Sequence, residues 1–215
     1  MAGERYSCEH VVPIDQEPRH HLVIANEFVR AFAVEIAPGD RTLCHHHPND
    51  YLLYVATDAE IVSAARGEEP KRLSYRNGEC ELSSAGLTHV VENLGDTPFR
   101  NVVVELLPAA TTLRRGVQPC ITGGVAQVER ILEESSGAIV RVAMQPSSEV
   151  EIAGPAVLAS PYEGRLQIKE LDAFDIPLDD FRKLMWVCAP RKVWIRNSGP
   201  ALGRMCAFQL GRADG

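Results

Sequence analysis

Residues 39–51 read GDRTLCHHHPNDY, and residues 78–93 read GECELSSAGLTHVVEN. These two stretches hold four of the chain's seven histidines, and no histidine follows His89. Alternate side chains of a β-strand share a face, so His45 and His47 are expected to project to the same side. Two imidazoles on one face can grip a metal ion, although an HxH pair beside a turn also occurs as an exposed histidine cluster. The residues around the histidines favour the metal site.

The spacing within both stretches is specific. In the first, five residues separate Gly39 from His45-x-His47. The second contains, in order, Gly78, five residues, Ser84-x-Gly86, two residues, His89, three residues and Asn93. This order and spacing resemble the two sequence motifs of the cupin superfamily, with one departure at Ser84, where proline is usual. The resemblance covers residues 26–107, somewhat under half of the chain.

The resemblance implies a double-stranded β-helix, the jelly-roll barrel of cupins, with the two motifs on neighbouring strands. The histidines would then converge inside the barrel, where His45, His47 and His89 form a triad that binds one divalent metal ion. Gly86 would let the chain bend sharply before His89. Asn93 is interpreted as a hydrogen-bonding residue at a turn or strand end rather than as a ligand.

The acidic ligand of the cupin pattern is missing from its usual place. Cupins place a glutamate three or four residues beyond the second histidine, where this chain has Tyr51 or Leu52, and Asp50 comes one residue earlier. If the strand continues in register from His47, Tyr51 faces inward and Asp50 outward, whereas a bulge or turn at Pro48-Asn49 would reverse this. We expect Tyr51 inside, as a weak ligand, acid/base group or hydrogen-bond donor. Asp50 is the alternative fourth ligand.

The predicted ligands limit the type of chemistry more than they limit the identity of the metal. Imidazoles suit Fe(II), Ni(II), Zn(II), Cu(II) and Mn(II), and a spacing pattern does not choose among them. Three neutral imidazoles leave the charge of the ion uncompensated, so its open positions attract an anionic or chelating oxygen. This favours an enolate, carboxylate or diketone-like molecule over a neutral sugar.

Beyond the two motifs, the chain reads as all-β. Short segments rich in Val, Ile, Leu and aromatic residues alternate with turns such as Asn77-Gly78, which is typical of a sandwich, barrel or jelly roll. These expected strands are residues 22–24, 28–36, 51–56, 90–93 and 101–107. Helical spacing is local: Val125–Glu134 has apolar residues at helical intervals, and Ile176–Leu184 is expected to form a second short helix or turn.

The second half of the chain resembles the first. AGLTHVVENLGDTPFRNVVVEL at 85–106 aligns with APRKVWIRNSGPALGRMCAFQL at 189–210, an offset of 104 residues that pairs Asn93 with Asn197. An earlier pair, VEIAPG and VAMQPS, aligns Pro38 with Pro146 at an offset of 108 residues. The smaller later offset implies that the second copy has lost a few residues.

The repeat predicts two tandem cupin barrels, a bicupin. A module with the metal site would occupy residues 1–112 and a degenerate module residues 113–215, with the boundary in Pro108–Gly124. The offsets match His89, His45 and His47 with Val193, Ala153 and Pro155, respectively. None of these three replacements can bind a metal through its side chain, so we expect the second module to pack against its partner, cover the site or form an interface.

The composition limits which kinds of partner and which cellular compartment we expect for this protein. With 22 basic and 29 acidic residues, the net charge is −7, which does not favour binding to the phosphates of nucleic acid. No run approaches the roughly 18 apolar residues of a membrane span, and the start, MAGERYSCEH, lacks the apolar core of a signal peptide. We expect a soluble, cytoplasmic protein whose six cysteines stay reduced.

These features together predict a metal-dependent cupin enzyme acting on a small molecule. The resemblance points to a dioxygenase similar to quercetin or diketone dioxygenases, in which the ion would activate an enolate towards O₂ and Tyr51 would move the proton. An oxygen-independent lyase or isomerase is a close alternative. A non-catalytic sensor or a module with a structural ion is another. The resemblance also implies a homodimer.

Overall fold

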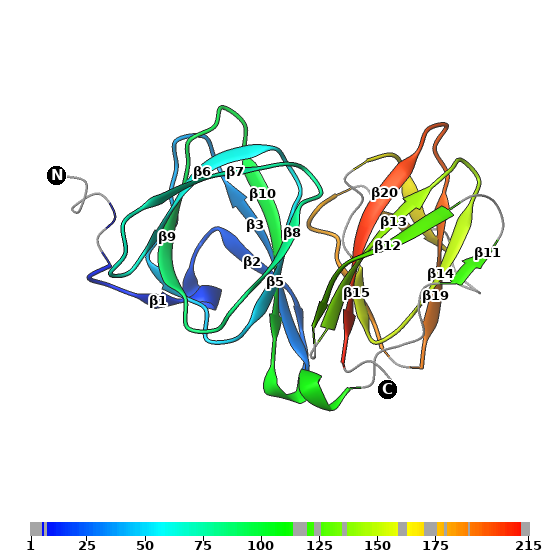
Figure 1. The fold of residues 1–215 in the computed structure, drawn as a ribbon, viewed down its shortest axis with the longest axis horizontal. Coiled ribbons are helices and arrows are strands. Elements are labelled where there is room, and N and C mark those ends of the chain that lie inside the picture. Colours follow the sequence, from blue (N-terminus) through cyan, green and yellow to red (C-terminus); the bar gives the residue numbers. More distant parts are fainter. Residues whose placement is uncertain are drawn as a thin grey trace. The chain divides into compact units, whose positions relative to one another are not determined.

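A computed structural model places the strands of the chain in two compact units (Figure 1). The first unit comprises Met1–Ala25 and Arg30–Leu106, and the second comprises Asn26–Val29 and Leu107–Gly215. The structure describes residues 6, 8–113, 120–122, 126–134, 137–158, 163–169, 176–178, 180–188 and 190–211. Part of the predicted boundary segment Pro108–Gly124 lies outside these residues. No helix in the described chain is long and apolar enough to cross a membrane.

The first unit is built from two five-stranded sheets. Its elements are β1 (Val12–Pro13), η1 (Ile14–Gln16), β2 (His20–Ala25), β3 (Val29–Ile36), β4 (His45–His46), β5 (Tyr51–Val55), β6 (Ala59–Ala65), β7 (Lys71–Tyr75), β8 (Cys80–Ser83), β9 (Thr88–Asn93) and β10 (Phe99–Leu106). Sheet A has the order β1-β4-β9-β6-β7, and sheet B has the order β2-β3-β10-β5-β8. Strands distant in sequence are neighbours in both sheets, as in a jelly roll.

The centre of sheet B shows why these residues form strands. Strands β3, β10 and β5 lie side by side, and β5 (YLLYV) is buried at all of its positions. Val, Phe and Tyr pack well on a pleated surface, and a strand covered on both faces can be apolar throughout rather than alternating. These three strands therefore form an apolar wall of the first barrel.

The second unit repeats this topology. After the 3-10 turn η2 (Pro108–Thr112), its strands are β11 (Cys120–Thr122), β12 (Ala126–Glu134), β13 (Gly137–Met144), β14 (Glu149–Ala153), β15 (Ala156–Leu158), β16 (Leu166–Lys169), β17 (Ile176–Leu178), β18 (Met185–Val187), β19 (Lys192–Asn197) and β20 (Gly203–Leu210). Their orders are β11-β14-β19-β16-β17 and β12-β13-β20-β15-β18. Each strand number of the first unit, raised by ten, gives its counterpart here. The described chain is all-β, as the sequence predicts.

Two asparagines make the same turn in both units. The side-chain NH₂ of Asn93 donates to Ile36 O at 3.0 Å and to Thr97 O at 2.8 Å, and its Oδ1 accepts from the N–H of Gly95 at 2.9 Å. The side chain of Asn197 makes the three corresponding bonds, to Met144 O, Ala201 O and Gly199 N. The repeat found in the sequence is thus a repeat of hydrogen bonds, and the interpretation of Asn93 as a turn residue is correct.

The strand register corrects part of the sequence alignment. His45 pairs with His89 across β4 and β9, and Ile152 pairs with Val193 across β14 and β19. The counterpart of His45 is therefore Ile152 rather than the predicted Ala153. A single offset read from the turn before β14 misplaces this strand by one residue.

The same shift applies to the second histidine of the motif. The N–H of His47 donates to Leu87 O, and the N–H of Gly154 donates to Arg191 O in the equivalent place. The counterpart of His47 is therefore Gly154 rather than the predicted Pro155. The conclusion drawn from the alignment still holds, because neither isoleucine nor glycine offers a side-chain ligand.

Apolar side chains fill the second barrel. Its core consists of Val140, Val142, Met144, Val150, Ile152, Ala156, Leu166, Ile168, Leu178, Val187, Val193, Ile195, Met205 and Ala207, all buried. Burying an aliphatic side chain of this size stabilises a fold by about 1.5–3 kcal/mol, whereas a buried imidazole without a partner costs free energy. The first barrel keeps four histidines in its interior, and this polar interior is the main difference between the two units.

The first expected helix is a strand, and the second expected element is a short strand followed by a turn. The apolar spacing of Val125–Glu134 predicts a helix, but Ala126–Glu134 is β12, which pairs with β13 along its length; Val125 lies outside the described residues. The register shifts between Arg130 and Leu132, and such a bulge breaks the alternation of a strand and produces apolar spacings that resemble a helix. In Ile176–Leu184, expected to be a short helix or turn, Ile176–Leu178 is the strand β17, paired with β16. The expected turn is present at residues 181–182, where the N–H of Lys183 donates to Asp180 O at 2.8 Å.

One expectation about the cysteines is wrong. Cys8 and Cys44 form a disulfide bond, while Cys80, Cys188 and Cys206 are free thiols. The expectation failed because a long chain does not need disulfides to support its core, but it can use one to fix a segment. This bond attaches residues 8–13, the N-terminal arm, to the strand that carries His45. Strand β1 of the arm runs parallel to β4, and the N–H of Val12 donates to Cys44 O at 3.0 Å.

Candidate metal centre

The two motif histidines His45 and His89 face each other across sheet A. They are direct partners in the antiparallel ladder of β4 and β9, and their ring centroids lie 4.7 Å apart. His47 follows β4 and is held by two backbone bonds, from its N–H to Leu87 O and from the N–H of Gly86 to its O, each 2.8 Å long. Gly86 has a φ of 93°, so the bend predicted before His89 is present.

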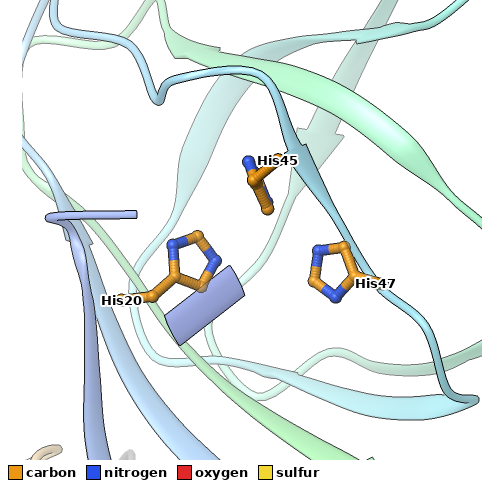
Figure 2. Close-up of side chains that lie close together, drawn as sticks. All are labelled: His20, His45 and His47. Carbon is orange, nitrogen blue, oxygen red and sulfur yellow. The ribbon is translucent and has the colours of Figure 1, made fainter. Parts of the chain in front are cut away.

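A fourth histidine, His20, completes the cluster. It is the first residue of β2, so it reaches the cluster from sheet B, and its ring centroid lies 4.6 Å from that of His45. The candidate ligand atoms of His20, His45 and His47 all lie within 4.8 Å of one another (Figure 2). The Nε2 atom of His89 lies 3.3 Å from Nε2 of His47. The structure therefore brings together the three predicted histidines and adds one.

Sequence reasoning missed His20 because no motif spacing includes it. It precedes the first motif, lies in the other sheet, and stands beside His21, which is exposed. One local signal was present. Glu17 lies three residues earlier, and a carboxylate near a histidine is a common support for a metal ligand.

Hydrogen bonds fix the orientation of three rings. Nδ1 of His45 donates to Leu43 O at 3.0 Å, and Nδ1 of His20 donates to Oε2 of Glu17 at 2.8 Å. Nδ1 of His89 lies 3.1 Å from Oγ of Ser63. When Nδ1 carries the proton, Nε2 keeps the lone pair that binds a metal. Nε2 of His45 is buried without a hydrogen-bond partner, as expected of a ligand atom.

Burial keeps these imidazoles uncharged. Burial, together with the neighbouring His20, lowers the pKa of His45 to about 4. Burial also lowers the pKa of His47 and of His89 well below the ordinary histidine value, assisted in both cases by the other histidines. A neutral imidazole is the form that coordinates a metal, so His45, His47 and His89 are in their ligand form near neutral pH.

Glu17 anchors the His20 side of the cluster. Its side chain is buried and accepts bonds from the N–H groups of Arg19 at 2.8 Å and Leu43 at 3.1 Å in addition to the bond from His20. Burial alone would raise the pKa of this carboxyl, but the hydrogen bond and charge of His20 and the two backbone N–H groups outweigh it and lower the pKa to about 2. Glu17 is therefore a carboxylate that supports His20.

Tyr51 faces the cluster and Asp50 does not. The ring of Tyr51 is buried and stacks on His47, with centroids 4.3 Å apart and planes at 25°. Burial raises the pKa of its phenol, which also hydrogen-bonds to Ser83. Asp50 is exposed, and its Oδ1 accepts from the N–H of Ala85 at 2.7 Å. The expected orientation of both residues is therefore found, but not through one continuous strand: β4 ends at His46, β5 begins at Tyr51 in the other sheet, and Asp50 stabilises a turn outside the cluster.

The cluster opens into a cavity of about 220 Å³ inside the first barrel. This volume is smaller than the roughly 300–1,000 Å³ of pockets for drug-sized ligands, so it suits a small metabolite. The walls are mostly aliphatic and aromatic, and none of the described lining residues is Lys or Arg. Buried ligand nitrogens, fixed rings and an adjoining cavity fit a bound metal ion that has access to a small molecule.

No family model and no curated protein sequence matches this chain. Solved structures do match its fold. Salicylate 1,2-dioxygenase from Pseudaminobacter salicylatoxidans has a TM-score of 0.61 at 11% identity, covering 91% of this chain and 77% of that one. The putative glyoxylate-induced protein from Pseudomonas aeruginosa also has a TM-score of 0.61, at 14% identity, with coverages of 89% and 79%.

A third similar structure is described as a cupin. The cupin 2 conserved barrel domain protein from Leptotrichia buccalis has a TM-score of 0.56 at 9% identity, covering 89% of this chain and 88% of that one. At these identities the similarity establishes the fold alone. The chain has the cupin fold in two tandem barrels, which confirms the predicted fold, and three of its histidines could hold a metal.

Proposed function

We propose that the first barrel binds one divalent metal ion through His20, His45, His47 and His89, and that it is a dioxygenase for a small enolisable or carboxylate-bearing molecule. The observation that carries this proposal is the convergence of four buried imidazoles beside a cavity, one with its Nε2 buried and unpartnered. The reaction class is supported by one of the structural neighbours, which is a salicylate 1,2-dioxygenase.

The ligand set defines what the ion would do. Bound by neutral imidazoles only, a divalent metal keeps its charge and would act as a Lewis acid towards an anionic oxygen of the substrate. Fe, Ni, Zn, Mn and Cu all accept such ligands. The set also departs from the usual cupin pattern, because His20 supplies a fourth nitrogen where an acidic oxygen is usual.

The chain's own residues supply positioning and proton transfer. Tyr51, stacked on His47 and kept protonated by its raised pKa, is placed to donate a hydrogen bond to a substrate oxygen and to return a proton to it. Its bond to Ser83 holds the phenol in place. The aliphatic walls exclude water from the reacting atoms, which strengthens each of these polar interactions.

Metal content tests the site. The untagged protein, purified without added metal, is compared by elemental analysis with a His45→Ala/His89→Ala variant and with a His10→Ala/His21→Ala control, whose two histidines are exposed. We expect a near-stoichiometric ion in the wild type and the control and none in the site variant. Absence of metal from all three, even after reconstitution, would reject the proposal.

Oxygen consumption tests the reaction. Metal-loaded protein is screened against small enols, diketones and hydroxy acids with an oxygen electrode and with product detection under anaerobic conditions. We expect oxygen uptake that the site variant lacks and that Tyr51→Phe reduces. Product formed without oxygen would replace the dioxygenase by a lyase or isomerase, and metal binding without turnover would indicate a binding module.

A further inference from the structure

Glu81 is an acidic side chain in the wall of the cavity. Among the described lining residues it is the only carboxylate, and none is Lys or Arg. A metal ion would place positive charge at the histidine cluster, and Glu81 places negative charge elsewhere on the same wall. With a metal bound, the cavity would therefore have positive charge at the histidines and negative charge at Glu81, and this pattern restricts which molecules it can bind.

Glu81 also marks the opening of the cavity. It is the one exposed residue among those lining it, and the half-buried ones belong mainly to β6, β7 and β8. Strand β7 is an edge of sheet A and β8 is an edge of sheet B, so the entrance lies where the two sheets part. A molecule that reaches the histidines passes Glu81.

An aromatic side chain completes this entrance. Tyr75 of β7 donates its phenolic proton to Oε1 of Glu81 at 3.1 Å, which bridges the edges of the two sheets. The ring of Tyr75 lies nearly parallel to that of Phe99, at 3° with centroids 6.2 Å apart, and both rings line the cavity. No described Lys or Arg forms an ion pair with Glu81. A carboxylate beside aromatic faces, without a basic residue to neutralise it, is the chemistry that binds ammonium groups.

We propose that Glu81 and Tyr75 recognise a protonated amine, so that the substrate is a small zwitterion with an anionic oxygen for the metal at one end and an ammonium group at the other. This inference rests on the proposed function, because the metal must hold the anionic end. It also states what the cavity rejects. A second carboxylate would be repelled by Glu81, with no Lys or Arg among the described lining residues to offset the repulsion, so dicarboxylates bind worst.

Isosteric ligands test this charge pattern. The protein is loaded with Co(II), whose visible spectrum reports a ligand at the metal, and is titrated with 4-aminobutanoate, pentanoate and glutarate, and with the analogous trios that are shorter or longer by one or two carbons. At the chain length that fits, we expect the amine to bind roughly five- to tenfold more tightly than the methyl analogue, and the dicarboxylate to bind most weakly.

Variants assign the preference to Glu81. Glu81→Gln should weaken binding of the amine about fivefold, strengthen binding of the dicarboxylate, and leave the methyl analogue within about twofold. Glu79→Gln is the matched control, since Glu79 is exposed on the β7–β8 turn, does not line the cavity and carries the same charge. It should change all three affinities by less than about twofold.

The outcomes separate this inference from the proposed function. If Co(II) binds and the His45→Ala/His89→Ala variant loses it, but the amine has no advantage at any chain length or keeps its advantage in Glu81→Gln, the ammonium site is wrong and the metal site stands. If Co(II) does not bind, the proposed function fails. In that case, ligand-observed NMR on the metal-free protein tests the ammonium site separately. If the amines show no preference there that depends on Glu81, the inference is overturned as well.

Discussion

At the scale of single residues, the candidate site depends on groups that do not face the metal position. Glu17, Leu43 O and Ser63 each engage Nδ1 of one histidine, which leaves Nε2 for the cluster. Such supporting bonds fix the tautomer and the ring orientation and raise the basicity of the ligand atom. The buried carboxylate of Glu17 is the strongest of these supports because it is charged.

Glu17→Gln tests this support. The amide keeps the size of the side chain and one acceptor oxygen but loses the charge, so we expect metal affinity to fall about 10- to 100-fold while the fold is retained. Competition with a chelator measures the affinity, and circular dichroism verifies the fold. Glu92→Gln is the control, because Glu92 is equally buried but binds Tyr6 instead of a histidine. Equal affinities in the two variants would remove Glu17 from the site.

A second buried acid, Glu105, predicts a pH effect on stability. Burial raises the pKa of its carboxyl above the ordinary value of 4.5, against the opposing charge of Arg30, which donates from Nε at 2.9 Å. The folded protein thus holds this proton more tightly than the unfolded chain, so the contribution of Glu105 to the free energy of unfolding falls as pH rises from about 4.5 through the raised pKa.

Glu105→Gln removes this titration. The free energy of unfolding of the variant minus that of the wild type should therefore increase with pH in that window and become constant above it. Urea denaturation at closely spaced pH values measures the difference, which cancels the titration of all other groups. A difference that does not change with pH would contradict the prediction. The second unit already has an amide at the equivalent position, Gln209, which is also fully buried.

The residue scale also shows how far sequence reasoning reaches. His45, His47 and His89 could be predicted because the two motifs have fixed spacings and lie on or beside the adjacent strands β4 and β9. Tyr51 does face inward as expected, but the assumed continuous strand from His47 is absent, so strand parity is not the reason. His20 was missed, because its place beside the other histidines depends on how sheet B packs against sheet A, and its one local signal is Glu17 three residues earlier.

At the scale of elements, the strand that carries His45 is held from outside the barrel. Strand β4 has only two residues, so its own ladder with β9 is short, and the N-terminal arm adds a parallel partner and the Cys8–Cys44 disulfide. The phenol of Tyr6 also donates to Oε2 of Glu92 at 2.7 Å, on the strand next to β4. The arm thus stabilises β4, the strand that carries His45.

Reduction of the disulfide should therefore lower stability. The bond closes a loop with a sequence separation of 36, for which the loss of chain entropy in the unfolded state gives at most about 4 kcal/mol. We expect a lower Tm in reducing agent and the same Tm for a Cys8→Ser variant with or without it, measured by scanning calorimetry. A wild-type Tm that is insensitive to reductant, despite a verified loss of the bond, would contradict a stabilising role.

Element prediction from the sequence succeeded where strands are long and apolar. The segments expected at 28–36, 51–56 and 101–107 are the central strands β3, β5 and β10 of sheet B. It failed for Ala126–Glu134, where a bulge disturbs the alternation, because periodicity alone cannot distinguish an interrupted strand from a helix. Strands as short as β4 are set by their neighbours rather than by their own residues.

At the scale of the whole molecule, one scaffold occurs twice with different interiors. The four histidines of the first barrel have as register counterparts Val128, Ile152, Gly154 and Val193. Val128 packs against the same apolar core that contains Ile152 and Val193. The hydrogen-bonded turns are shared, so the fold does not depend on the histidines.

This difference predicts one metal ion per chain. Titration with Co(II), followed by elemental analysis after dialysis, should give a ratio near one for the wild type and near zero for His45→Ala/His89→Ala, because the second interior has no side-chain ligand at any of the four positions. A ratio of two, with one ion retained in the variant, would contradict the prediction and place a second site away from the histidine cluster.

The glycine at the counterpart of His47 has a consequence for what the second barrel could become. A Cβ atom at Gly154 would overlap the backbone of Val187 and Cys188, so this backbone occupies the space that a histidine side chain would need. Histidine at the other three counterpart positions would not build the cluster there, because the backbone beside Gly154 would first have to retreat. A second metal centre would therefore require a different backbone path as well as new side chains, and substitution one residue at a time would not produce it.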